Sequence, residues 1–278
     1  MPTRGNLTDA QWMKLRPFLP PVKPTRGRPN KPHRRIINAI LWVLRTGAPW
    51  RDLPRSYGPW STVYSRFRRW RILGIWAMIL QCLRELMHRQ GLIDWSIHHI
   101  DGTVIRAHQD AAGARKLPGE DPESSRRRQK LGKSRGGLTT KPVIRVDALG
   151  HLISMVLLPG QRHDIMGFID VMEKGAIQGV RGRPRLRPRR VVGDKGFSAK
   201  WTRAWLKERN VRQTIAKRED ENRTGPFDRE IYRSRNVVER TIGRYKKKFR
   251  RLATRYDKLG SSYESFWDIA AIYYVIQS

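Results

Sequence analysis

Three acidic residues lie inside regular elements that the sequence predicts, far apart along the chain. Asp101 is on a predicted strand, Asp194 ends a short apolar strand, and Glu239 lies inside a long predicted helix. In an α/β fold, a carboxylate at the end of a strand lies where the crevice of the fold opens. The three side chains are therefore candidates for one shared site.

Carboxylates that converge on one point repel each other unless a cation lies between them. Oxygen ligands of this kind favour Mg²⁺ or Mn²⁺, and two such ions ~4 Å apart can activate an attacking oxygen and stabilise a leaving oxygen in phosphodiester displacement. We therefore expect Asp101, Asp194 and Glu239 to be catalytic and to bind two divalent ions. The alternative for each residue is ordinary: an Asp after a strand forms a turn, and Glu239 pairs with Arg235 four positions earlier.

The helix that carries Glu239 has a second feature. Tyr232, Arg235, Glu239 and Lys246 are spaced by three, four and seven residues, which keeps them on one helical face. Beside this face runs an apolar stripe that is expected to pack on a sheet, formed by Val238, Ile242, Tyr245, Phe249 and Leu252. We expect Lys246 to contact nucleic-acid phosphate, and Tyr232 and Arg235 to help position the same ligand.

The histidines offer a different site. His98 and His99 could ligate Zn²⁺ together with Asp101, helped by His151 or by the His163-Asp164 pair. Adjacent residues of a strand point to opposite faces, which argues against that site. The His163-Asp164 pair could still lie beside the acidic residues, or Asp164 could simply cap a helix.

Composition indicates the partner. The 278 residues include 58 Lys and Arg against 24 Asp and Glu, a formal net charge of +34 that is spread along the whole chain. Such a charge is typical of proteins that bind DNA or RNA. No apolar run approaches the ~20 residues of a membrane helix, and no secretory signal is recognisable. Cys82 is the single cysteine, so no intrachain disulfide can form, which fits a reducing cytosol.

Residues 1–92 predict a basic helical domain. Thr8 is placed to cap a first helix, and Gly47 closes a helix whose apolar positions begin at Ile36. A turn separates this helix from one opened by Ser61 or Thr62. The second helix carries Arg66, Arg68 and Arg69, as a DNA-binding helix-turn-helix would. Arg26–Pro29 recurs as Arg181–Pro184, either as arginines for a narrow minor groove or as two flexible basic loops.

Residues 93–278 predict an α/β layer with a mixed sheet. The expected elements are strand 96–105, loop 109–142, a hairpin of strands 143–146 and 151–157, helix 165–174, strand 189–194, helix 198–209, strand 211–215 and one helix from about 228 to beyond 250.

With these motifs assembled, the sequence resembles the DDE transposases of the bacterial insertion sequence five family. The pattern Tyr-x₂-Arg-x₃-Glu-x₆-Lys, here Tyr232 to Lys246, matches the C-terminal signature of that family. Other matching segments are His99-Ile100-Asp101-Gly102-Thr103, Val192-Gly193-Asp194-Lys195-Gly196-Phe197, Leu44–Pro54 and Ser134–Lys141. Phe197 is a departure, because many relatives have Tyr there.

The resemblance implies an RNase H-like catalytic domain over residues 93–278, two Mg²⁺ (or Mn²⁺) ions, and action on the terminal inverted repeats of an insertion sequence. Water would attack at the element ends, and the freed 3′-hydroxyls would then attack target DNA. We expect double-stranded DNA as the partner, a homodimer on that DNA, and a cytoplasmic, nucleoid-associated location. Two alternatives stay open: a catalytically silent DNA-binding regulator, and a metal-dependent nuclease without a joining step.

Overall fold

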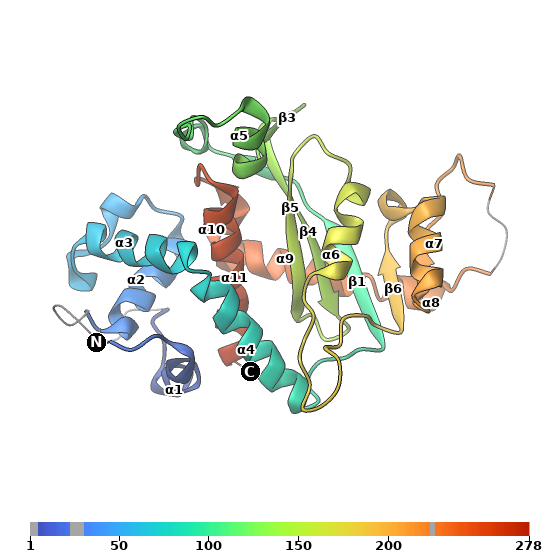
Figure 1. The fold of residues 1–278 in the computed structure, drawn as a ribbon, viewed down its shortest axis with the longest axis horizontal. Coiled ribbons are helices and arrows are strands. Elements are labelled where there is room, and N and C mark those ends of the chain that lie inside the picture. Colours follow the sequence, from blue (N-terminus) through green and yellow to red (C-terminus); the bar gives the residue numbers. More distant parts are fainter. Residues whose placement is uncertain (1–4, 23–30, 223–225, 278) are drawn as a thin grey trace.

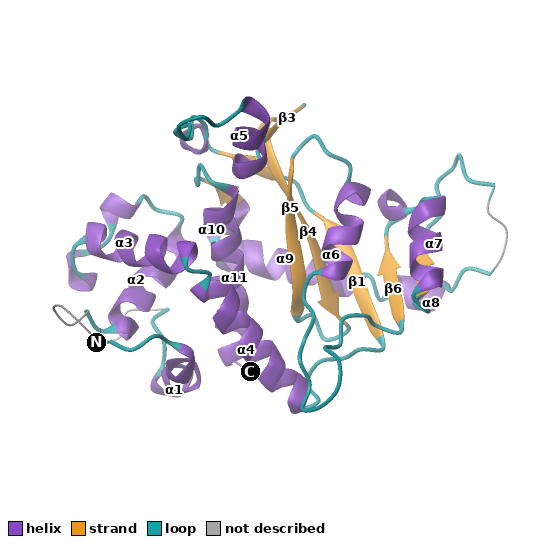
Figure 2. Cartoon of the chain, in the orientation of Figure 1, coloured by secondary structure: helices purple, strands orange, loops and turns teal. Residues whose placement is uncertain are grey.

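A mixed β-sheet organises one half of the chain (Figures 1 and 2). The structure is a computed structural model that describes residues 5–22, 31–222 and 226–277. Strand β4 (Gly137–Asp147) pairs antiparallel with β1 (Ile97–Gly102) on one side and with β5 (Leu152–Pro159) on the other. Strand β6 (Arg190–Gly193) lies parallel to β1, and β7 (Arg212–Ile215) lies parallel to β6.

The resulting order β7-β6-β1-β4-β5 is that of an RNase H-like sheet, so the predicted fold class is confirmed. Three short strands extend the sheet around the first half of β4. β2 (Ile105–Ala107) continues from β1 along β4 and pairs with β8 (Thr254–Arg255), and β3 (Gly132–Ser134) forms a hairpin with the start of β4.

Helices cover both faces of the sheet because its strands alternate apolar side chains between the faces. Val143 and Val156 pack with α6 (Phe168–Glu173) and α7 (Lys200–Glu208), whereas Ile144 and Met155 belong to the cluster that contains α9 and α11. The second layer contains α8 (Arg229–Arg233), α9 (Asn236–Lys248), α10 (Arg250–Ala253) and α11 (Gly260–Gln277).

The N-terminal helices share the apolar core of this second layer. They are α1 (Asp9–Leu15), α2 (His33–Thr46), α3 (Trp60–Ile72) and α4 (Ile75–Arg89). One continuous buried cluster runs from Leu7 and Ile40 through Phe67 to Phe266 and Trp267 of α11. Figure 1 shows the blue and cyan helices beside the red C-terminal helices. Whether residues 1–92 form a separate domain remains a prediction.

Several local predictions are confirmed. Thr8 caps α1 through a reciprocal pair of hydrogen bonds with Gln11, and Gly47 ends α2 in the left-handed conformation with φ 75°. The Arg26–Pro29 segment, with its suggested minor-groove contact, lies outside the described residues. Its repeat at Arg181–Pro184 is an exposed loop next to a short bridge between Ile177 and Arg185.

Two predictions were wrong. Residues 109–142 are not one loop, because they contain α5 (Pro122–Gln129), β3 and the first half of β4. Asp121 caps α5 by accepting from the amides of Glu123 and Ser124, and Pro122 follows at the first helical position. The helix from 228 to beyond 250 is also interrupted, by a turn at Ser234 and Arg235 and by extended backbone at Phe249.

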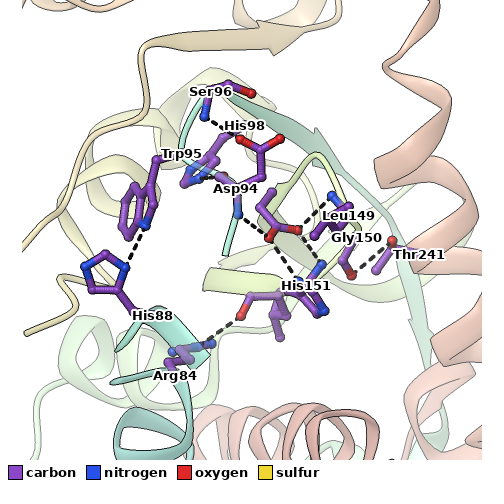
Figure 3. Close-up of polar contacts among 12 residues, drawn as sticks. Arg84, His88, Asp94, Trp95, Ser96, His98, Leu149, Gly150, His151 and Thr241 are labelled. Carbon is purple, nitrogen blue, oxygen red and sulfur yellow. Dashed lines mark hydrogen bonds and ion pairs between the residues drawn. The ribbon is translucent and has the colours of Figure 1, made fainter. Parts of the chain in front are cut away.

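At the end of the sheet shown in Figure 3, a buried carboxylate organises the turn between β4 and β5. Asp147 has no exposed surface. It accepts hydrogen bonds from the backbone amides of Asp94, Leu149 and His151 and from the His151 ring. Each oxygen therefore has donors, and the turn is held in one conformation.

Candidate active site

Asp101 and Asp194 lie side by side at the opposite end of β1 from Asp147. Ile100 of β1 is paired in parallel with Gly193 of β6, and each acidic residue is the next in its chain. Neighbouring strands lie ~4.8 Å apart, so the two carboxylates leave the same edge of the sheet together. Asp194 also caps a 3₁₀ turn, accepting from the amide of Gly196 at 2.9 Å.

Glu239 reaches this edge from the first turn of α9, which packs across β1 and β4. Arg235 connects it to the strand. The Arg235 guanidinium donates an N–H to Glu239 Oε1, and its other terminal nitrogen lies 3.5 Å from Asp101 Oδ2. The pairing of Glu239 with Arg235, left open by the sequence, is therefore present, and the same guanidinium also binds the first aspartate.

Burial and neighbouring carboxylates disfavour the ionised forms of both aspartates. Burial raises the pKa of Asp101 to about 6; Arg235 lowers it, while Asp194 and Glu239 raise it further. Burial likewise raises the pKa of Asp194; the Gly196 amide lowers it and Asp164 raises it. Carboxylates that resist ionisation in this way favour an added cation.

Asp164 is a fourth carboxylate at the same edge. It begins the 3₁₀ turn Asp164–Gly167 after β5, and it forms an ion pair with Lys141 of β4 at 2.6 Å. Its side chain packs directly against Gly102. A Cβ atom added to residue 102 would lie 2.6 Å from Asp164 Cγ, so a larger residue there would clash. Asp164 does not act as the helix cap that was the alternative for it, because His163 occupies the cap position.

The remaining residues of the C-terminal signature surround these carboxylates. Lys246 Nζ donates to Thr103 Oγ1 at 2.7 Å, two residues beyond Asp101. Burial lowers the pKa of Lys246, and the charge of Asp101 raises it. Tyr232 lies on α8 with its ring 5.9 Å from the Arg235 guanidinium carbon. The break between α8 and α9 thus leaves the predicted residues together, although they do not share one straight helix.

The histidines do not form the alternative zinc site. His98 bonds to the Asp94 carbonyl and His151 bonds to Asp147, both at the far end of the sheet (Figure 3). His99 Nε2 lies 2.8 Å from Ser234 Oγ. Among residues 5–22, 31–222 and 226–277, no three His, Cys, Asp or Glu side chains stand in an arrangement that could hold a metal ion.

His99 has a supporting position that the sequence did not reveal. Ser234 donates its hydroxyl to the Ile231 carbonyl, so the buried His99 ring donates to Ser234 at the joint between α8 and α9. Burial lowers the pKa of His99 to about 4, so the ring is neutral at pH 7. The bond fixes the helix turn that presents Arg235 to Asp101.

The three arginines predicted for DNA contact differ in their surroundings. Arg68 and Arg69 of α3 are exposed. Arg66 is half-buried, bonds to His33 Nδ1 at 3.0 Å and lies 5.6 Å over the Trp70 ring. Arg68 and Arg69 are thus accessible to a ligand, whereas Arg66 joins α3 to α2.

Two family models cover most of the chain. A model described as a transposase DDE domain matches residues 96–275, and one described as a putative transposase of the IS4/5 family matches residues 7–80. The chain belongs to the DDE transposase family. That family comprises enzymes of transposition and generally uses divalent metal ions.

Two curated proteins named as uncharacterized are similar to part of this chain. The chain is 37% identical over 113 residues to the uncharacterized protein y4sN of Sinorhizobium fredii (strain NBRC 101917 / NGR234), covering 41% of this chain and 86% of that protein. It is 35% identical over 126 residues to the insertion element IS402 uncharacterized 16.2 kDa protein of Burkholderia cepacia, covering 43% and 83%.

A third relative is named as a putative transposase. The putative transposase for insertion sequence element IS402, also of Burkholderia cepacia, is 30% identical over 128 residues, covering 46% of this chain and 58% of that protein. Among solved structures, a chain of the Mos1 strand transfer complex is 12% identical and covers 92% of this chain and 78% of its own, with a TM-score of 0.30. At that TM-score the likeness adds nothing to the assignment. No described helix of this transposase is both long and apolar enough to cross a membrane.

Proposed function

We propose that this transposase binds the terminal inverted repeats of its insertion sequence and catalyses DNA strand cleavage followed by strand transfer. The observation that carries the proposal is the convergence of Asp101, Asp194 and Glu239 at one edge of the sheet, with the pKa of both aspartates raised. Residues 93–278 would perform the chemistry and residues 1–92 would recognise the element ends.

The carboxylates at this edge have the donor chemistry that Mg²⁺ or Mn²⁺ requires, although their side chains are not arranged around a common metal position within the described residues. Asp101, Asp194 and Glu239 would hold a pair of these ions, since all the donors are carboxylate oxygens and their charge exceeds that of the guanidinium among them. When bound, such ions activate an oxygen nucleophile and stabilise the leaving oxygen. Glu239 is half-exposed, so rotation about its side-chain bonds can exchange Arg235 for a cation.

The other side chains would position the DNA. Arg235 neutralises part of the carboxylate charge and orients Asp101, while His99 and Ser234 fix the turn that carries Arg235. Lys246 lies beside Asp101 at Thr103 and would bind the phosphate next to the reacting one. Tyr232 would line the same path, and the exposed Arg68 and Arg69 of α3 would contact the element end.

The proposed strand transfer and the positive charge also suggest how the protein assembles and where it is found. Joining two element ends to one target requires two catalytic centres, so we propose a homodimer on DNA. We further propose a location at the nucleoid of a bacterial cytoplasm, since the charge of +34 would hold the protein on chromosomal DNA.

The test uses purified full-length protein, DNA that carries the element ends, and Mg²⁺. Asp101→Asn, Asp194→Asn and Glu239→Gln should each lower the rate of strand cleavage by roughly 10³-fold or more and leave duplex binding intact. Glu208→Gln, at an exposed carboxylate of α7, is the matched control and should cleave normally.

Two outcomes would contradict the proposal in different ways. If the wild-type protein binds element ends but never cleaves them, the DNA-binding regulator is the better description. If it cleaves but produces no joined product from supplied 3′-hydroxyl ends and target DNA, the protein is a nuclease without strand transfer.

A further inference from the structure

A cavity separate from the carboxylate edge opens between the N-terminal and C-terminal helices. Its volume is about 1230 Å³, and it is lined by α3, the turn at Pro49–Arg51, the segment 108–118 and the connection between α10 and α11. In Figure 1, α3 lies to the left of α10 and α5 lies above it. We propose that this cavity binds unpaired nucleotides of DNA. The inference rests on the proposed function, in which DNA is the ligand.

Exposed aromatic rings form one wall. Trp60 and Tyr64 of α3 are 37% and 39% exposed, and Trp50 lies with its ring 5.4 Å from that of Tyr64. Tyr256, on the α10–α11 side, lies 5.2 Å from the ring of His108. Arg51 lies 5.7 Å from the centre of the Trp60 ring. Partly exposed aromatic rings beside cations are the surfaces on which unpaired bases stack.

The charges of the lining suit a polyanion. Two carboxylates belong to the lining: Asp257 pairs with Arg251, and Asp110 lies 3.2 Å from His108 Nδ1. Arg128 pairs with Glu120. The other basic side chains of the lining have no carboxylate ion-pair partner within the described parts of the chain; they are Arg51, Arg68, Arg71, Arg115, Lys116 and Lys258. An apolar peptide would leave these cations desolvated and unpaired, whereas a phosphodiester backbone would pair with them.

The combination of rings and cations selects unpaired nucleotides over duplex. In a duplex the base faces are covered by stacking, so aromatic rings in a cavity can reach them only when nucleotides leave the helix. Pockets for drug-sized molecules hold roughly 300–1,000 Å³. The cavity volume of about 1230 Å³ therefore leaves room for more than one nucleotide.

Strand β2 leads along the chain from the carboxylate edge to the cavity. Thr103 bonds to Lys246 beside Asp101, and His108 lines the cavity; strand β2 runs between them. At ~3.3 Å per residue, the five steps from residue 103 to residue 108 span at most about 17 Å. That distance corresponds to about five base pairs at 3.4 Å per step, so the unpaired nucleotides should lie within about five base pairs of the cleaved phosphodiester.

The test compares two duplexes that carry the element end and differ in one feature. One contains two unpaired 2-aminopurine nucleotides within five base pairs of the cleavage point, and the other is fully paired. Wild-type protein should bind the unpaired probe about tenfold more tightly, and stacking should quench the 2-aminopurine fluorescence. In the double variant Trp60→Ala, Tyr64→Ala both effects should disappear, while affinity for the paired duplex stays within twofold.

Matched variants keep the result interpretable. Trp201→Ala removes a 44% exposed tryptophan of α7, outside the cavity, and should retain the preference. If the alanine variant does not fold by circular dichroism, Trp60→Leu with Tyr64→Leu keeps the apolar volume and removes the rings. Equal affinity of the wild-type protein for both probes, or a preference that survives loss of the rings, would overturn the inference. Failure to bind either duplex would instead contradict the proposed function.

Discussion

The two ends of the β1–β4 pair carry a fully buried carboxylate and a partly buried one in opposite circumstances. At one end, Asp147 is fully buried and accepts from three backbone amides and the His151 ring. At the other end, Asp101 accepts from the Gly102 amide and shares one guanidinium with Glu239, with Asp194 beside it. Burial raises the pKa of Asp101 to about 6.

The difference separates structural carboxylates from candidate catalytic ones. A buried charge that is met by fixed donors stabilises the fold and leaves no capacity for a ligand. A set of carboxylates with too few positive partners costs stability, and this cost is recovered only when a cation arrives. Asp147 is more deeply buried than Asp101, so burial alone does not identify the candidate catalytic carboxylate. The number of hydrogen-bond donors around each carboxylate distinguishes the two.

The largest expected effect is a difference in cleavage rate between variants at Asp101 and at Asp147. Asp101→Asn should lower strand cleavage by roughly 10³-fold or more without lowering the thermal midpoint, because it removes a carboxylate that repels its neighbours. Asp147→Asn should leave cleavage per folded molecule within a few fold. Cleavage assays normalised to the folded fraction measure both; equal losses would show that the two carboxylates have one kind of role.

The second prediction concerns the contribution of Asp147, whose carboxylate oxygens all have hydrogen-bond donors, to the stability of the fold. Asp147→Asn should lower the free energy of unfolding by about 3–5 kcal/mol, because it weakens charge-assisted hydrogen bonds and turns an amide N–H toward backbone donors. Urea unfolding at pH 7 without metal measures this loss. Asp101→Asn in the same assay should cause no loss, and a comparable destabilisation would remove the distinction between the two ends.

The third prediction tests the ion pair that supports the carboxylate edge. Lys141→Met should cost about 2–4 kcal/mol of unfolding free energy, because Asp164 would remain mostly buried without its cation. Adding Asp164→Asn should recover about half of that loss, since the unpaired charge is gone. A double-mutant cycle gives the coupling; strictly additive losses would show that the pair is not an energetic unit.

The fourth prediction is the pH dependence of Asp101. Its folded pKa of about 6 lies above the ordinary value of 3.8, so the folded chain holds this proton more tightly than the unfolded chain. The contribution of this group to stability is therefore full below pH 4 and is lost as pH rises to about 6. Asp101→Asn should become more stable than wild type by roughly 2–3 kcal/mol between pH 4 and pH 7 without metal. A difference that does not change with pH would contradict the raised pKa.

The smallest effect concerns Lys246. Lys246→Met should lower the slope of log affinity against log salt by about 1, as expected for the loss of one phosphate contact. Arg89→Met, at the C-terminal end of α4, is the control, because Arg89 pairs with Glu85 of the same helix and is not among the residues proposed to contact DNA. Identical salt slopes for the Lys246 variant and the wild-type protein would show that Lys246 does not contact DNA phosphate.

Much of the sheet could be predicted because its signals are local. The apolar segments 143–146 and 151–157, with a turn between them, form the central hairpin. The strand that ends at Asp194 is buried and carries the residue to the sheet edge. Pairing of β1 with β6 in parallel then determines that Asp101 and Asp194 are neighbours, which is a long-range consequence of the fold class.

The missed elements lacked a local signal or had a misleading one. Helix α5 is rich in Ser and Arg, like a loop, and its end is held from afar by Arg255, which donates to the carbonyls of Gln129 and Lys130. The apolar side chains of helix α11 are not gathered on one face, so the sequence has no amphipathic period there that would predict the helix. The closeness of Asp164 to Gly102 depends on where the β5 edge brings the chain back, and residue type does not encode that position.

The central position of α11 has a consequence for how the molecule is made. This helix follows every other described element in the chain, yet Phe266 and Trp267 complete the apolar cluster that α2, α3 and α4 begin. During synthesis, the first helices must wait with their apolar faces uncovered until residues 260–277 emerge. A stop codon just before Gly260 would therefore yield an aggregating chain, even though every carboxylate of the candidate site would have been translated.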